Sequence, residues 1–174
     1  MTRWAAVLRV LACALLLVSC GIETLTDEEF ASRPDLYGGY FSFREAGITE
    51  VRDLVGGDAV PVRFLSLLDN SEAQVQAVPG DGPGELDLWV IDDGRVTTRR
   101  PIVDPNTGST FLLTDECIGL LARIADRAID DAGFDDAVLE SMIVGADGIS
   151  AEVRSERRTA TLRYDGGGRL TGRD

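Results

Sequence analysis

The sequence contains no histidine and no lysine, and its 17 basic residues are all arginines. The absence of histidine excludes Ser-His-Asp and Cys-His hydrolases and any imidazole ligand to a metal. The absence of lysine excludes Schiff-base chemistry, Ser-Lys dyads and the P-loop lysine of nucleotide-binding proteins. These absences remove much of the catalytic repertoire and leave carboxylates as the plentiful catalytic groups. Our main expectation is a chain with no catalytic residue, no metal site and no cofactor.

Positive charge is scarce as well. The chain has 30 Asp and Glu residues against 17 basic residues, which gives a formal net charge of −13 at pH 7. Proteins that bind nucleic acid gain most of their affinity from cations that contact phosphates. The charge therefore argues against nucleic acid as a partner.

The apolar run near the start of the chain, Val10–Val18, is too short to cross a membrane. A membrane-spanning helix needs about 20 apolar residues. Arg3 and Arg9 precede the run, and no acidic residue occurs before it. A basic start followed by a short apolar stretch is typical of a secretory signal peptide.

The run ends in Leu17-Val18-Ser19-Cys20, which resembles the lipobox of bacterial lipoproteins at all four positions. The resemblance implies that residues 1–19 are a signal peptide and that Cys20 becomes the first residue of the mature chain. It also implies a diacylglyceryl thioether on Cys20 and a fatty acyl chain such as palmitate on its amino group. Because several acyl chains anchor a protein stably, we expect a cell-membrane location on the extracytoplasmic side, with residues 20–24 as a short tether.

Cysteine usage agrees with this interpretation. Of the three cysteines, Cys13 leaves with the signal peptide and Cys20 carries lipid, so Cys117 is the remaining thiol. No intrachain disulfide is then possible in the mature chain. We expect Cys117 to be a small core residue.

The body contains segments that recur in the same order. Leu25–Phe30 (LTDEEF) is similar to Leu113–Ile118 (LTDECI), and Leu88–Thr97 is similar to Leu162–Thr171. A shared order of similar segments is typical of internal duplication. We therefore divide the body into a first half at 25–103, a connection at 104–112 and a second half at 113–174.

The second half shows the clearer pattern. Thr114 is a suitable N-cap, and apolar residues at three- and four-residue spacing after it predict an amphipathic helix that ends near Gly133. Alternating apolar and polar residues then predict β-strands at 137–144, 149–155 and 159–164 and a last short strand. A helix that covers the apolar face of an antiparallel meander is an α+β fold.

The first half shows the same plan. Thr26 and Glu29 form a possible capping box for a short helix, and a second helical stretch ends near Val55. Strands are expected at 60–68, 72–78, 85–91 and 95–103. The predicted fold is therefore α+β, built from two helix-plus-antiparallel-meander halves that are duplicated and packed together.

The strand-turn-strand segments also carry a family resemblance. Tyr164–Thr171 and Val103–Gly108 are similar to hairpins of PepSY-type modules, and the duplicated plan resembles the β-lactamase-inhibitory protein architecture. The resemblance implies an exported protein that binds or inhibits a partner and is not an enzyme.

One candidate for partner binding lies in the strand at 85–91. If Leu86, Leu88 and Val90 face the helix, then Trp89 and Ile91 lie on the outer face of the sheet. Exposed aromatic residues are frequent energetic centres of protein interfaces. Trp89 and Ile91 are therefore predicted to bind a partner.

Three functions remain open. We expect a membrane-anchored cell-envelope lipoprotein with a non-enzymatic binding or scaffolding role toward an unknown envelope protein. The alternative is a carrier or sensor of a small or lipidic ligand, held in a cavity between a sheet and the aromatic segment 37–43. A third function is a glycan hydrolase that uses a carboxylate pair such as Asp92/Asp93 or Asp130/Asp131.

Overall fold

The computed structural model describes residues 40–79, 85–103 and 108–174, and the side chains of Tyr40 and Phe41 are excluded from the description. Cys20 and the Thr26/Glu29 capping box lie outside these ranges. The signal peptide, the tether and the first short helix therefore stay predictions.

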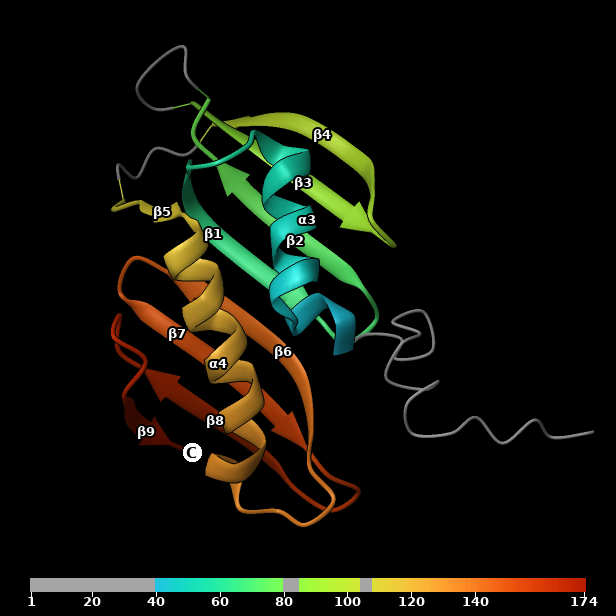
Figure 1. The fold of residues 1–174 in the computed structure, drawn as a ribbon, viewed down its shortest axis with the longest axis vertical. Coiled ribbons are helices and arrows are strands. Elements are labelled where there is room, and N and C mark those ends of the chain that lie inside the picture. The colour runs from blue at the N-terminus through green and yellow to red at the C-terminus, as the bar shows by residue number, and fades with distance from the viewer. Residues whose placement is uncertain (1–39, 80–84, 104–107) are drawn as a thin grey trace, which may run out of the picture. The chain divides into compact units, whose positions relative to one another are not determined.

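The described residues form two α-helices, a short 3-10 helix and a set of β-strands (Figure 1). The helices are η2 (Tyr40–Phe43), α3 (Glu45–Val55) and α4 (Asp115–Ala132). The strands are β1 (Val60–Leu68), β2 (Glu72–Ala77), β3 (Glu85–Asp92), β4 (Arg95–Val103), β5 (Phe111–Leu113), β6 (Val138–Gly145), β7 (Gly148–Arg154), β8 (Thr159–Tyr164) and β9 (Leu170–Arg173). Strand bounds agree with the predicted ones to within one or two residues, except for β5, which the sequence did not indicate.

All the strands belong to one antiparallel sheet, in the order β4-β3-β2-β1-β6-β7-β8-β9, with β5 paired to β1. The α+β class is therefore confirmed. Each half runs from a helix into four consecutive strands, and the halves share one sheet through the β1–β6 pair, in which Leu65 lies opposite Val144. Both helices lie on the same side of this sheet (Figure 1).

Helix α4 begins and ends where the sequence predicts. Thr114 is extended and its Oγ1 accepts a hydrogen bond of 3.3 Å from the backbone N–H of Cys117. Gly133 ends the helix in the left-handed conformation, with φ of 62°. A hydroxyl N-cap and a left-handed glycine satisfy polar groups that the helix ends leave open.

The core lies between the helices and the sheet. In β7, for example, Ile149, Ala151 and Val153 are buried, while Glu152 and Arg154 are exposed. This alternation agrees with the predicted faces of the second half.

The predicted exposure of Trp89 and Ile91 is wrong. Trp89 is 8% exposed and Ile91 is 2% exposed, and both belong to the core cluster. Their cross-strand neighbours are the buried residues Val75 and Ala73. Strand β3 carries apolar side chains on both of its faces. Alternation alone therefore could not tell which of its two faces packs against the helices.

Candidate functional site: the open face of the sheet

The sheet has one face covered by helices and one face that no described helix covers. Helices α3 and α4 both pack on the first face, which carries the buried residues of the core (Figure 1). Side chains that alternate with those core residues point to the opposite side. We call this second side of the sheet the open face.

The middle of the open face lacks charged side chains. Cross-strand pairing aligns residues of five neighbouring strands, β3, β2, β1, β6 and β7, into two adjacent rows that run across the sheet. None of the ten positions in these rows is charged. We call them the uncharged field: Val90, Gln74, Ser66, Ile143 and Ser150 in one row, and Leu88, Gln76, Phe64, Gly145 and Gly148 in the other.

The field combines apolar side chains with uncharged hydrogen-bonding groups. Ile143, near its centre, is 44% exposed, whereas Ser66 beside it is 8% exposed. The other eight positions are half-buried. The field is therefore a partly accessible surface of mixed apolar and amide character.

Charged side chains surround the field. Arg154 and Glu140 form an ion pair at 3.2 Å, and Arg163 pairs with Asp174. At the β4 side, Arg100 lies next to Leu88 in the register and has no polar partner among the described residues. An uncharged centre within a charged margin is the usual arrangement of a protein–protein interface.

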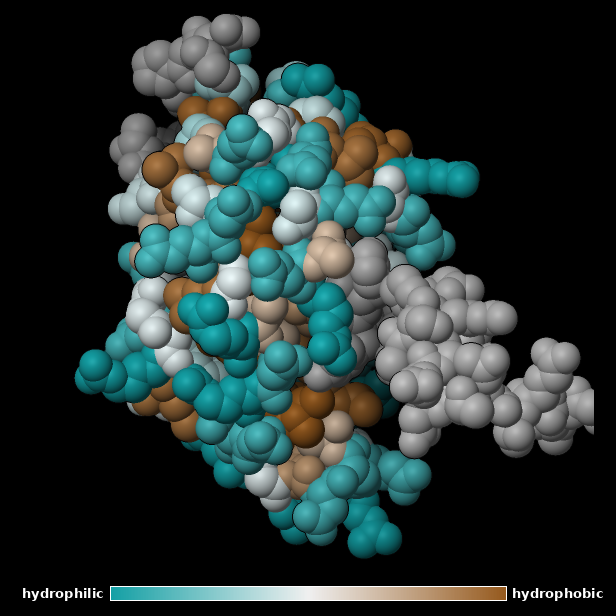
Figure 2. All heavy atoms as spheres, in the orientation of Figure 1, coloured by the Kyte–Doolittle hydropathy of each residue, from teal (hydrophilic) through white to brown (hydrophobic). Residues whose placement is uncertain are grey.

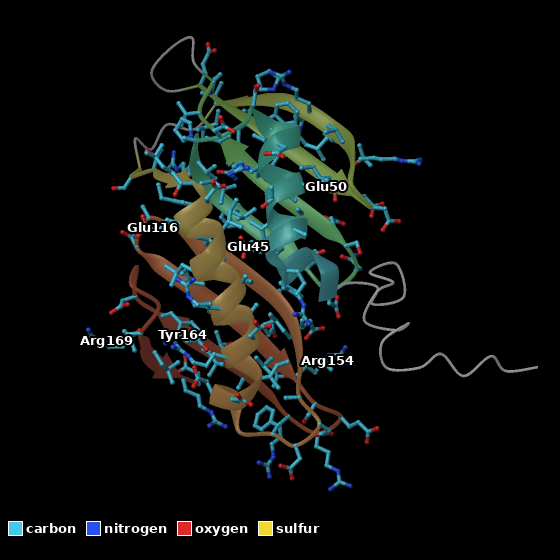
Figure 3. All side chains as sticks on the ribbon, viewed as in Figure 1. Glu45, Glu50, Glu116, Arg154, Tyr164 and Arg169 are labelled. Atoms are coloured by element: carbon cyan, nitrogen blue, oxygen red, sulfur yellow. The ribbon has the colours of Figure 1, made fainter. Side chains whose placement is uncertain are left out.

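The helix side is different because it is acidic. Helices α3 and α4 carry eight acidic residues and three arginines. Figure 3 shows Glu45 and Glu50 on α3 and Glu116 on α4, and Figure 2 shows mostly hydrophilic side chains over this side. With eight acids and three arginines, the two helices contribute a formal charge of −5 on the side opposite the field.

Trp89 lies on the helix side near the sheet edge. The guanidinium of Arg99 stacks over its ring, with Cζ 4.3 Å from the ring centroid. The Nη2 group of Arg99 also donates to Asp87 Oδ2 at 2.9 Å. Trp89 is thus covered by a neighbouring strand, and its buried Nε1–H has no acceptor among the described residues.

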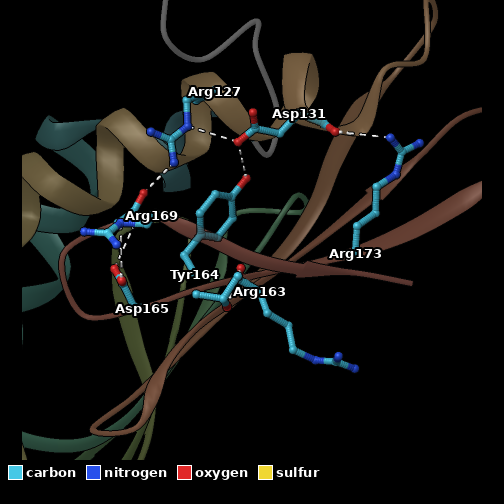
Figure 4. A network of polar contacts seen from close by, with 9 residues as sticks. Arg127, Asp131, Arg163, Tyr164, Asp165, Arg169 and Arg173 are labelled. Carbon is cyan, nitrogen blue, oxygen red and sulfur yellow. Dashed lines mark hydrogen bonds and ion pairs between the residues drawn. The ribbon is translucent and has the colours of Figure 1, made fainter.

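A polar network joins α4 to the β8–β9 hairpin (Figure 4). The hydroxyl of Tyr164 donates to Asp131 Oδ2 at 3.0 Å, and Arg127 Nε donates to the same oxygen at 3.0 Å. Arg127 also donates to the backbone oxygen of Gly168. Burial and the contact with the Asp131 carboxylate raise the pKa of Tyr164 above its ordinary value. These contacts hold the hairpin against the helix.

An open groove of about 510 Å³ runs beside this network, between α4 and the β8–β9 turn. Its lining combines apolar side chains with two arginines and two aspartates. The lining residues are Leu120, Arg123, Ile124, Asp126, Arg127, Asp130, Gly167 and Gly168. Because opposite charges are equal in number, the groove has no net preference for an anion or a cation.

The carboxylate pairs considered for hydrolysis lie in different surroundings. Asp92 and Asp93 are exposed at the turn between β3 and β4. Asp130 is exposed on α4, whereas Asp131 accepts from Tyr164. In the ranges that the structure describes, no three potential metal ligands come together, and no helix is long and apolar enough to cross a membrane.

Cys117 is half-buried, next to the core cluster, and burial raises the pKa of its thiol. A raised pKa lowers the thiolate fraction at neutral pH. This environment agrees with the expected packing role.

The uncharged field was not predicted from the sequence. Its signal was present in the alternation of Gln74 and Gln76 with Ala73 and Val75, which places amides where exposed strands usually carry charge. The pairing of β1 with β6, which joins both halves of the field, needs the tertiary structure.

Comparisons with known proteins found little. No protein-family model matches the sequence, and no curated protein matches it. The chain is similar in structure to a "putative lipoprotein" from Clostridium difficile 630, solved by crystallography, with a TM-score of 0.49 and 11% sequence identity. The similarity covers 77% of this chain and 93% of that one.

Proposed function

We propose that this chain is a cell-envelope lipoprotein whose body binds a partner through the open face of its sheet and has no enzymatic activity. The anchor is Cys20, on the extracytoplasmic side of the membrane. The observation that carries the binding role is the uncharged field in a chain with a formal charge of −13.

Several features support the proposal. The lipobox Leu17–Cys20 supports the anchor. The common helix-then-four-strands order of the halves supports an origin by duplication. Such a duplication would produce a sheet broad enough to present one continuous binding face.

The anchor is tested by Cys20→Ser. We expect the wild-type chain in the membrane fraction, with an intact mass that shows cleavage before Cys20 and added acyl groups. The variant should lose the acyl mass and leave the washed membrane fraction. A variant that stays with membranes as strongly as the wild type, or a wild-type chain without acyl mass, would contradict the anchor.

A carrier role is the second candidate, favoured by the groove between α4 and the β8–β9 turn. Its volume of about 510 Å³ lies within the range of small-molecule sites, about 300–1,000 Å³. A carrier should retain a small molecule in native mass spectrometry after purification from membranes. Gly167→Leu should displace it, because Gly167 lines the groove, whereas Gly166→Leu should not, because nothing lies within 4 Å of a Cβ at Gly166.

A further inference from the structure

We infer that the occupant of the open face is a folded, net basic protein that presents a flat uncharged patch to the uncharged field. This inference rests on the proposed binding function and names the partner of that same face. The net charge of the chain disfavours a second copy as the occupant, and the glutamine amides of the field disfavour a lipid surface.

The chemistry of the field fits a protein surface. Centres of protein–protein interfaces are depleted of charged residues and combine apolar groups with hydrogen-bonding groups. Phe64, Leu88 and Ile143 supply apolar area, and the amides of Gln74 and Gln76 supply donors and acceptors. A lipid surface would leave these two amides without partners in an apolar environment, which is costly.

The size of the face also fits a protein. The main path of the sheet has eight strands. At about 4.8 Å between strands and about 20 Å of strand length, such a face covers roughly 700–800 Å². A standard interface buries about 800 Å² on each partner. The open face alone is therefore large enough for a stable complex, and the field of five strands would form its centre.

Charge indicates which protein fits. Two copies of a chain with formal charge −13 repel one another, which disfavours pairing of two open faces. A basic partner is attracted at long range, although the contact itself is uncharged. At the margin, Arg100 at the β4 side and Glu152 on β7 have no polar partner among the described residues, so each can pair with an opposite charge on the partner.

The first experiment uses photo-crosslinking in intact cells with the full-length chain. A benzophenone amino acid replaces Ile143 in the field or, as a control, Glu50, which is exposed on α3. We expect a discrete adduct with a different, basic protein at position 143 and no such adduct at position 50.

The second experiment measures binding of the partner so identified to purified variants. Ile143→Asp places a charge in the field and should raise the Kd at least tenfold. Leu170→Asp is the matched control, because Leu170 is 38% exposed and lies across β8–β9 from buried Tyr164, on the helix side; it should change the Kd by less than about threefold. Both variants should keep the wild-type thermal midpoint, and wild-type affinity should fall as salt concentration rises.

Any of the following outcomes would overturn the inference. An adduct with a second copy of the chain identifies self-association, and an adduct with lipid identifies a membrane contact. A protein adduct at position 50 alone leaves the binding function standing and refutes the open face as its site. The absence of any protein adduct at either position counts against both the inference and the proposed function. Equal effects of Ile143→Asp and Leu170→Asp, or an affinity that does not depend on salt, also refute it.

Discussion

Two glycines that face each other in the field differ sharply in what they tolerate, and this difference gives a demanding test of the structure. Gly145 and Gly148 are cross-strand partners at the β6–β7 hairpin. A Cβ at Gly145 would meet nothing within 4 Å. A Cβ at Gly148 would lie 2.6 Å from the backbone oxygen of Tyr164, and Gly148 has φ of 144°, where side chains are rarely found.

The expected cost of Gly148→Ala follows from these values. Backbone strain in such a region costs about 1–3 kcal/mol. Overpacking against an atom of the backbone, which cannot rotate away, costs about 1–3 kcal/mol more. The loss of unfolded-state freedom offsets about 0.4–1 kcal/mol. We therefore expect Gly148→Ala to lower the free energy of unfolding by about 3 kcal/mol, or the melting temperature by about 6–12 °C.

Gly145→Ala is the control. It should change the free energy of unfolding by less than about 1 kcal/mol in either direction, because the new methyl group meets no atom and no positive φ is involved. Urea unfolding of both variants is followed by far-ultraviolet circular dichroism and by the fluorescence of Trp89. Equal stabilities of the two variants, or a loss below about 1 kcal/mol for Gly148→Ala, would refute the hairpin geometry that shapes this part of the open face.

Three further predictions concern the helix side. Tyr164→Phe removes the hydrogen bond to Asp131 and should lower the free energy of unfolding by about 1.5–3 kcal/mol. Because the folded-state pKa of Tyr164 is raised, the stability of the wild type should also fall as the pH rises above about 10. Tyr164→Phe should not show this loss of stability at alkaline pH. Backbone N–H groups, first that of Arg169, lower the pKa of Asp165, so the carboxylate stabilises the fold above about pH 4 and this contribution is lost as the pH falls further. In urea unfolding at a series of pH values, Asp165→Asn should reduce the loss of stability at acid pH. An unchanged loss would contradict the contact. Removal of the stacked guanidinium by Arg99→Ala should expose Trp89 and shift its emission to longer wavelength, whereas an unchanged spectrum would refute the stacking.

Much of the fold follows from local patterns. Thr114 and Gly133 mark the ends of α4 by well-understood capping chemistry, and the strict alternation in β7 and β8 identifies both the strands and their inner faces. These signals depend on neighbours in the chain, so a single sequence reveals them.

The remaining features depend on contacts between distant segments. In β3, both alternating sets are apolar, and only pairing with β2 places Trp89 opposite Val75 in the core. Strand β5 has three residues, too few for a periodic signal, and it forms because Leu113 pairs with Val60. The Tyr164–Asp131 contact likewise joins residues from separate elements, so neither residue type nor spacing indicated it.

If the open face binds a partner, the field is covered in the cell and uncovered in the isolated chain. Cysteine is introduced by Ile143→Cys in the field or by Glu50→Cys on the helix side, and labelling by a membrane-impermeant maleimide is compared between opened cell envelopes and the purified chain, with the unsubstituted protein as background. We predict that position 143 is protected in envelopes and reactive after purification, while position 50 reacts in both. Equal labelling of position 143 in both preparations would contradict the claim that the open face binds a partner.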